Sequence, residues 1–276
     1  QDGSSASNTF MTKTVVYFAH ANGIASPCYQ TFFDYFDADI ELKYIPVIGL
    51  NPDYPVEPKW EKLVAQVIAD IELQTPKQAV VGLGHSFGAL VLLMASYQRP
   101  DLFSQLILMD PPFVIGKTAP IFELLQKLGS KKIDHLTPAG LSLKRKDAWS
   151  NREQAYQQLR GNALFKQFDE RCFQDCIQHG LKEDEAGISL QIPKQVEADI
   201  FRTVPSWWWR WPRKAPNLPV HLITAEQSAF YKQGFPQGLK KIYGIEFSVV
   251  AGGHMFPLES PEQSARDVQQ RIRSAL

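Results

Sequence analysis

The sequence has few cysteines, no net charge and no long hydrophobic run. Its cysteines, Cys28, Cys172 and Cys176, are too few and too scattered among 276 residues for a disulfide framework. Basic and acidic side chains balance at 29 each, so no overall field favours nucleic acid or an anionic membrane. No stretch has the apolar length that crosses a bilayer. These absences predict a soluble, cytoplasmic protein with neither a nucleic-acid partner nor a membrane span, and they leave open whether it forms a homodimer.

Motifs for metal or phosphate binding are also missing. Cys172 and Cys176 lie four apart on a predicted helix, but without further ligands a small buried face explains them better than a metal pair. We therefore predict no metal and no cofactor. Residues 1–10 are small and polar, and Met11 stands just before an apolar run. We expect residues 1–10 to be a disordered leader or an expression remnant.

Short apolar runs rich in β-branched residues recur along the chain and predict strands. They are continuous rather than alternating, as in strands that are buried on both faces. They lie at 14–20, 41–48, 78–85, 104–110, 219–225 and 246–253. Helical patterns at 60–73 and 87–98 fall between them. This alternation predicts an α/β fold with a doubly wound, mostly parallel sheet of about six strands.

The alternation stops between residues 113 and 217, where helical patterns replace the strands. So long a segment cannot be one loop in a compact domain. We predict a helical cap over 113–217, inserted into an α/β core formed by 11–112 and 218–276. Near the end of this segment stand Trp207, Trp208 and Trp209. They either pack the cap onto the core or form an apolar wall over a substrate pocket, and both can hold at once.

The segment Gly84-His85-Ser86-Phe87-Gly88 has the spacing G-x-S-x-G. A bare pentapeptide match is weak evidence, but an apolar strand precedes this one and a helical stretch follows it, as the motif requires. On so sharp a turn a serine is strained, and side chains at 84 and 88 would collide with neighbouring backbone. We predict that Ser86 is a nucleophile.

A serine hydroxyl needs a base to remove its proton. His254 lies on a glycine-rich turn after the last predicted strand, from which an imidazole can reach Ser86 across the carboxyl edge of the sheet. The other histidines suit structural roles. His221 is expected in the core, His135 and His179 on the surface, and His85 should point away from the serine.

The imidazole in turn needs a carboxylate, which Asp110 or Glu226 could supply from the ends of two strands. Topology alone does not choose between them, because both strand ends meet at one edge of the sheet. An acid at the second place usually stands a few residues beyond the strand, where this chain has Gln227 and Ser228. Asp110 is therefore favoured, with Glu226 as the second choice.

An oxyanion hole requires two backbone N–H groups, and Phe87, next to the serine, supplies one. The turn after the first strand can aim the N–H of Ala21 or Asn22 at the same point. His20 and Asn22 can brace this loop through side-chain hydrogen bonds. We also place His20 among the candidate residues of the substrate pocket.

This pattern resembles the α/β-hydrolase superfamily from Met11 to the end of the chain. The resemblance rests on 84–88, on the order Ser86, acid, His254, and on GGHMFPLESPE (252–262), similar to the histidine-loop signature. HANG (20–23) and GISLQIPKQVEADIF (187–201) resemble a narrower branch that includes acyl-CoA hydrolases of fungal natural-product pathways. In that branch the acid follows the sixth strand, which corresponds to Asp110. Little chain precedes the first strand here, so the usual initial hairpin is not expected.

These residues together predict a cofactor-independent serine hydrolase that cleaves a small-molecule carboxylic ester or thioester with an apolar acyl part. Acyl-CoA thioesters, C–C bonds, lactones and acyl transfer stay open as variants of the same chemistry. Arg202, Arg210, Arg213 and Lys214 could receive a CoA phosphate, although a solvated face explains them as well. A binding protein that uses the pocket without turnover is the alternative from another class.

Overall fold

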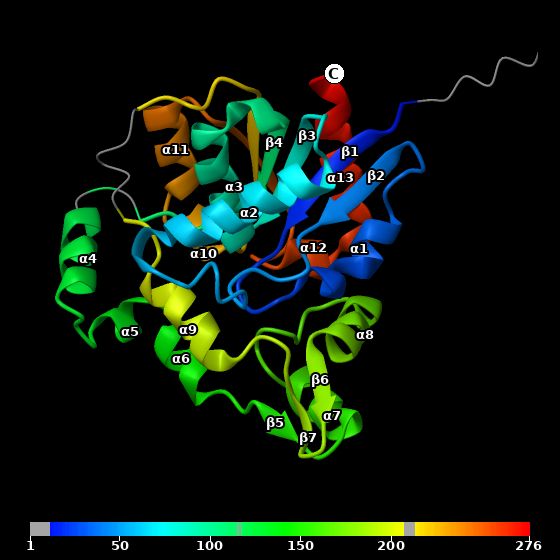
Figure 1. The fold of residues 1–276 in the computed structure, drawn as a ribbon, viewed down its shortest axis with the longest axis vertical. Coiled ribbons are helices and arrows are strands. Elements are labelled where there is room, and N and C mark those ends of the chain that lie inside the picture. Colours follow the sequence, from blue (N-terminus) through cyan, green and yellow to red (C-terminus); the bar gives the residue numbers. More distant parts are fainter. Residues whose placement is uncertain (1–11, 115, 117, 207–212) are drawn as a thin grey trace, which may run out of the picture.

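The computed structural model describes residues 12–114, 116, 118–206 and 213–276. Six parallel strands form its main sheet in the order β2-β1-β3-β4-β8-β9 (Figure 1). They are β1 (Thr14–Ala19), β2 (Ile40–Tyr44), β3 (Val80–His85), β4 (Phe103–Met109), β8 (Val220–Ala225) and β9 (Glu246–Val250). The predicted six-stranded parallel sheet is confirmed.

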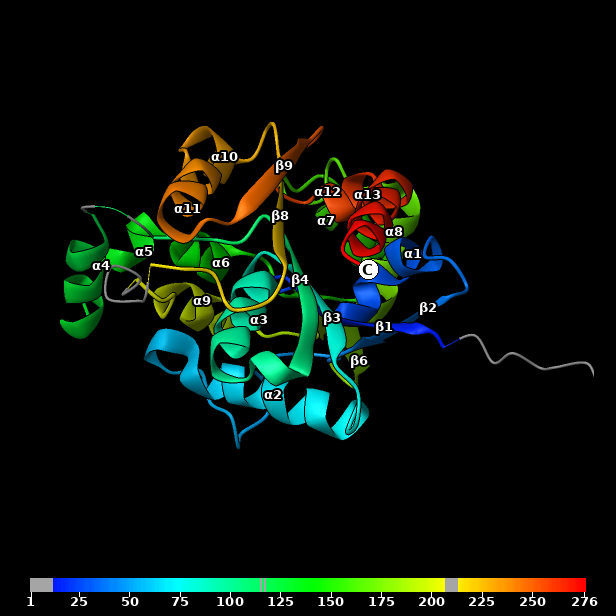
Figure 2. The same ribbon diagram turned by 90° about the horizontal axis from the view of Figure 1, so that it is seen from above.

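Helices cover both faces of this sheet (Figure 2). Along β1, Val15 and Tyr17 face one apolar core while Val16 and Phe18 face the other, which makes the strand apolar throughout. The first core is completed by α2 (Glu61–Gln74), α3 (Phe87–Gln98) and α11 (Phe235–Tyr243), the second by α1 (Gln30–Asp34) and α13 (Pro261–Ser274). The edge strands β2 and β9 are the most exposed, whereas the inner strands are mostly buried. The sheet therefore sits between two helical layers.

The chain between β4 and β8 leaves the sheet and forms a separate body, seen below it in Figure 1, which we call the cap. Its helices are α4 (Thr118–Lys127), α5 (Ile133–Leu136), α6 (Ala139–Lys144), α7 (Arg152–Arg160), α8 (Glu170–His179) and α9 (Lys194–Arg202). The cap also has a small antiparallel sheet, which the sequence analysis did not predict. Its strands are β5 (Ala148–Trp149), β7 (Gly187–Leu190) and β6 (Leu181–Asp184).

Polar contacts at several places fix the cap to the core, two of them near its opposite ends. Trp60, just before α2, donates its indole N–H to the carbonyl of Ile200 at 3.1 Å and to Thr203 Oγ1 at 3.0 Å. Near the other end of the cap, Asp175 on α8 accepts from both the N–H and the hydroxyl of Thr31. Because both contacts are at least partly shielded from water, they resist exchange with solvent and hold the cap against the carboxyl edge of the sheet.

Candidate active site

Ser86 stands at the turn between β3 and α3 with a backbone conformation that few residues other than glycine adopt. Its φ is +53° and its ψ −117°. The two flanking glycines allow this turn. A Cβ at Gly84 would lie 2.4 Å from Ala89 Cα, and one at Gly88 would lie 2.2 Å from the carbonyl oxygen of Ala19. The prediction that side chains at these positions would collide with backbone is confirmed.

Asp110 follows β4 and is buried, with 1% of its surface exposed. Each carboxylate oxygen accepts hydrogen bonds: Oδ1 from Thr224 at 2.7 Å, and Oδ2 from Ser228 at 2.5 Å and from His254 Nδ1 at 2.5 Å. A buried carboxylate is stable only with such partners. These bonds fix Asp110 and direct one of its oxygens to the imidazole.

Glu226, the second-choice acid, has no hydrogen bond to this cluster in the described residues. It is exposed, and its side chain has no hydrogen bond or ion pair with any described residue. Ser228, two residues further on, instead occupies the space beside Asp110 and donates to it. The turn after β8 therefore contributes a donor to the acid and not the acid itself.

His254 lies between Asp110 and the surface, with a third of its side chain exposed. Asp110 engages its Nδ1, and Phe230 packs edge-on against its ring at 5.2 Å. Its Nε2 is left to exchange a proton with another group. Ser86 and His254 come to the same edge of the sheet, since His85, adjacent to the serine, binds the backbone of His254. In the described residues no hydrogen bond joins Ser86 Oγ to His254.

A buried chain of hydrogen bonds connects the three loops of the site through His85. The His254 carbonyl can only accept, so His85 Nε2 carries the proton and donates to it at 2.8 Å. His85 Nδ1 then accepts from the Tyr29 hydroxyl at 2.7 Å, and that hydroxyl accepts from the N–H of Ala21 at 3.2 Å. His85 thus binds to the histidine loop on one side and to the loop after β1 on the other.

Burial keeps this histidine neutral. Desolvation, with a smaller contribution from the neighbouring His254, lowers the pKa of His85 to about 3. A group with this pKa does not take up a proton near neutral pH. His85 is therefore a structural element, as predicted, whereas His254 is the imidazole with access to the reacting side of the edge.

His20 braces the loop after β1, and its proposed part in a substrate pocket stays a prediction. Its Nδ1 donates to the carbonyl of Ala21 at 2.7 Å, and its Nε2 accepts from the N–H of Ile48 at 2.8 Å. The side chain is buried, and desolvation lowers its pKa to about 4. Both ring nitrogens are engaged, so His20 braces the loop as the alternative interpretation held.

Two of the backbone N–H groups predicted as oxyanion donors have no acceptor in the described part of the chain. They belong to Phe87, at the first position of α3, and to Asn22, in the loop after β1. The N–H of Ala21 is already bound to Tyr29, so the choice of Ala21 as an oxyanion donor is wrong. Phe87 and Asn22 are the pair available to a developing oxyanion.

The remaining candidates lie away from this cluster or outside the described residues. His135 and His179 are exposed, as predicted, and His221 is half-buried against Ser248. The tryptophans at 207, 208 and 209 fall in a range that the structure does not describe, so their proposed part in a pocket stays a prediction.

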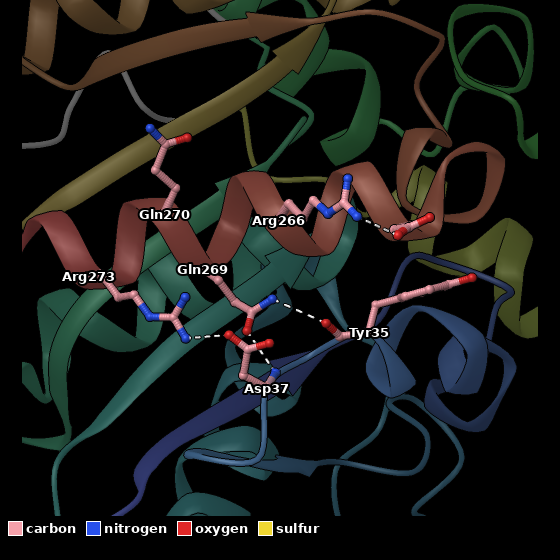
Figure 3. Close-up of a pocket in the computed structure, with 7 residues that line it drawn as sticks. Tyr35, Asp37, Arg266, Gln269, Gln270 and Arg273 are labelled. Atoms are coloured by element: carbon pink, nitrogen blue, oxygen red, sulfur yellow. Dashed lines mark hydrogen bonds and ion pairs between the residues drawn. The ribbon is translucent and has the colours of Figure 1, made fainter.

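A hollow of about 640 Å³ lies between α1 and α13 (Figure 3). Its polar groups bind one another: Arg273 pairs with Asp37 at 2.6 Å, and Gln269 contacts the backbone of Tyr35 and of Asp37. Asp37 precedes β2, so this hollow reaches the amino edge of the sheet, opposite to Ser86. It is not part of the candidate site.

Neither a metal centre nor a membrane span occurs in residues 12–114, 116, 118–206 and 213–276. No three acidic, histidine or cysteine side chains gather there as metal ligands, and no helix has the length and apolar character to cross a bilayer. The three cysteines are free and buried.

Three residues that support the site were not found from the sequence. Thr224 and Ser228 orient Asp110, and Tyr29 connects His85 to Ala21. Ser228 could have been found from the sequence, because a hydroxyl stands there in place of the usual acid. It implies that the carboxylate is elsewhere, at Asp110, and that the hydroxyl can donate to it. Tyr29 gave no signal, because its partners are remote in the sequence.

The chain is similar to proteins that include hydrolases and thioesterases. The sequence profile of the alpha/beta hydrolase family matches residues 16–267. Among solved structures, E-2-(acetamidomethylene)succinate hydrolase covers 95% of this chain and 91% of its own at a TM-score of 0.73 and 15% identity. The thioesterase domain from the curacin biosynthetic pathway covers 94% and 91% at a TM-score of 0.71 and 15% identity. At such identities these two structures show a shared fold.

Curated relatives share shorter segments. The type I acyl-CoA thioesterase mpaH of Penicillium brevicompactum is 30% identical over 105 residues, which are 38% of this chain and 22% of that protein. The abhydrolase domain-containing protein AFT2-1 of Alternaria alternata is 30% identical over 115 residues, 42% of this chain and 38% of that protein. The chain thus spans well under half the length of these relatives.

Proposed function

Because the chain belongs to the alpha/beta hydrolase family, we propose that it is a serine hydrolase acting on a carboxylic ester or thioester with an apolar acyl part. Hydrolases, esterases and thioesterases share its fold. The observation that carries the proposal is the alignment of Ser86, His254 and Asp110 at one edge of the sheet, with His254 Nδ1 bound to a buried carboxylate.

In the proposed reaction Ser86 Oγ attacks the carbonyl carbon while His254 Nε2 takes up the hydroxyl proton. Asp110 holds the imidazole in the tautomer that leaves Nε2 free and stabilises the imidazolium. The N–H groups of Phe87 and Asn22 stabilise the oxyanion. His254 then returns the proton to the leaving oxygen or sulfur, and water releases the acyl group by the same steps.

Acyl-CoA thioesters are a narrower candidate substrate class, favoured by the similarity to acyl-CoA thioesterases. Arg202 is poorly placed to receive a CoA phosphate, since Asp134 binds it at 2.7 and 2.9 Å and Asp199 at 3.2 Å. Arg213 and Lys214 are exposed and could serve instead. If they do, acyl-CoA turnover should fall steeply with added salt and in Arg213→Ala, while turnover of a simple ester stays constant. Equal effects on both substrates would exclude such a phosphate contact.

Labelling with a fluorophosphonate tests the proposal itself and separates an enzyme from a binding protein. The folded protein should form an adduct at Ser86, found by peptide mass spectrometry, and Ser86→Ala should form none. An unlabelled Ser86 in folded protein, without turnover of any ester, would refute the serine hydrolase.

Asp110→Asn and Glu226→Gln should differ sharply in kcat. Loss of the carboxylate at 110 changes the tautomer and orientation of His254, so we expect kcat to fall by about 10⁴-fold. Glu226→Gln should retain turnover because that side chain is exposed and has no hydrogen bond to His254 in the described residues. Both are measured with a p-nitrophenyl ester at saturation, and a collapse in Glu226→Gln alone would reverse the assignment of the acid.

A further inference from the structure

The cap touches the loop that carries the free N–H of Asn22. The side-chain amide of Asn22 donates to the carbonyl of Glu197 on α9 at 2.9 Å. The carboxyl group of Glu197 lies over the next residue, Gly23, where an added Cβ would come within 2.9 Å of its Cδ. Gly23 also has a φ of +84°. One residue of the cap therefore contacts two consecutive residues of this loop.

A charge pair inside the cap holds Glu197 in this position. Only 6% of Glu197 is exposed. Its Oε2 accepts from Arg145 Nη1 at 3.1 Å and its Oε1 from the Ser142 hydroxyl at 3.2 Å. Burial raises the pKa of Glu197, and Arg145 counteracts the rise by favouring the ionised form. Because an unpaired buried charge is costly, Arg145 fixes the place of the carboxylate and with it that of α9.

We propose that Glu197, held by Arg145, is a positioning residue that aims the N–H of Asn22 at the oxyanion. The inference rests on the proposed serine hydrolase. It also gives a physical reason for the joint presence of HANG (20–23) and KQVEADIF (194–201): the two segments form one contact between core and cap.

Displacement of an oxyanion donor has a specific effect on the kinetic constants. An oxyanion donor acts on the transition state far more than on the bound substrate, so displacing it lowers kcat and leaves KM nearly unchanged. A residue that only stabilises the fold would change the melting temperature without this separation. A trifluoromethyl ketone, which forms an oxyanion on the serine, reports on the same donor at equilibrium.

The test uses Glu197→Gln, Arg145→Met and Asn22→Ala. The last keeps the N–H of residue 22 and removes only the bond to Glu197, so it serves even if a cap variant fails to fold. For a p-nitrophenyl ester we expect kcat to fall by about 10- to 100-fold in each, with KM within about twofold. The affinity for the trifluoromethyl ketone should weaken by the same factor as kcat.

Asp134→Asn is the matched control. It breaks an ion pair with the same helix α9, at Arg202, without touching residues 20–23. It should lower the melting temperature and keep kcat within about twofold. The double variant Glu197→Gln with Arg145→Met leaves no stranded charge and should regain part of the lost kcat.

The results of these experiments distinguish the positioning role of Glu197 from the serine hydrolase activity on which it rests. Unchanged kcat and ketone affinity in the folded variants, or an equal loss in Asp134→Asn, would overturn the role of Glu197 while the labelled Ser86 still upholds the hydrolase. A wild-type protein without a Ser86 adduct or turnover would overturn both.

Discussion

At the scale of single residues, Tyr29 holds two loops of the site together. Its hydroxyl links Ala21 to His85, because it accepts from the N–H of Ala21 and donates to His85 Nδ1. Burial raises the pKa of Tyr29, which keeps the proton available for donation. Neither partner can turn to water, because both are buried.

We therefore expect Tyr29→Phe to lower the free energy of unfolding by about 1–3 kcal/mol, since it strands a buried donor and a buried acceptor. Urea unfolding followed by fluorescence measures the change. Tyr44→Phe is the control, because Tyr44 also stacks on Phe33 but its hydroxyl has no hydrogen bond in the described chain. It should cost under about 0.5 kcal/mol. Equal losses in the two variants would show that the hydroxyl of Tyr29 contributes nothing special.

At the scale of elements, α3 approaches the sheet so closely that its first turn has no room for a side chain at residue 88. The carbonyl of Ala19, at the end of β1, lies in the space of a Cβ. This close approach brings the N–H of Phe87 towards the loop after β1. The packing of α3 against β1 therefore also determines the geometry of the proposed oxyanion site.

Gly88→Ala should accordingly damage both stability and reactivity. The methyl group meets backbone, which cannot move aside as a side chain can, and we expect a loss of about 3 kcal/mol in unfolding free energy and little labelling of Ser86. Gly161→Ala provides the control, because Gly161 has a φ of −82° and its added Cβ would meet nothing nearer than 3.8 Å. That variant should be neutral or more stable by up to about 1 kcal/mol. Normal labelling of a stable Gly88→Ala would contradict the proposed packing.

At the scale of the whole molecule, three histidines are held neutral in the folded state. Desolvation lowers the pKa of His20 and of His221 to about 4 and that of His85 to about 3. The unfolded chain binds a proton at each of them below about pH 6.5, and the folded protein does not. Their contribution to stability is therefore complete above pH 6.5 and is lost as the pH falls towards 4.

The free energy of unfolding should thus decrease between pH 6.5 and 5 by up to about 1.4 kcal/mol per pH unit for each of these histidines. The raised pKa of Glu197 acts in the opposite direction, but it is one group against three. Urea unfolding at several pH values measures the slope, and His221→Gln should reduce it by about one proton. A flat profile from pH 7 to 5 would show that these imidazoles are not buried neutral.

The sequence alone was sufficient to predict the sheet and to select the candidate site residues, but not to predict the contacts that hold these residues in place. Continuous β-branched runs exist only where both faces are buried, so β1, β3 and β4 were predictable. In contrast, β6 reads LKED and is largely exposed, so no apolar pattern marks it. Tyr29 and Glu197 act on partners far along the chain, and no local pattern reports such pairings.

The insertion of the cap between neighbouring strands determines the order in which the protein can assemble during synthesis. β4 pairs with β8, yet residues 110–219 separate them, so this pairing closes a long loop and is entropically late. Ser86 and Asp110 emerge from the ribosome before the cap, whereas Thr224, Ser228 and His254 follow it. A nascent chain therefore carries Ser86 without the imidazole while the cap is synthesised, and the complete site forms only after the cap has been made.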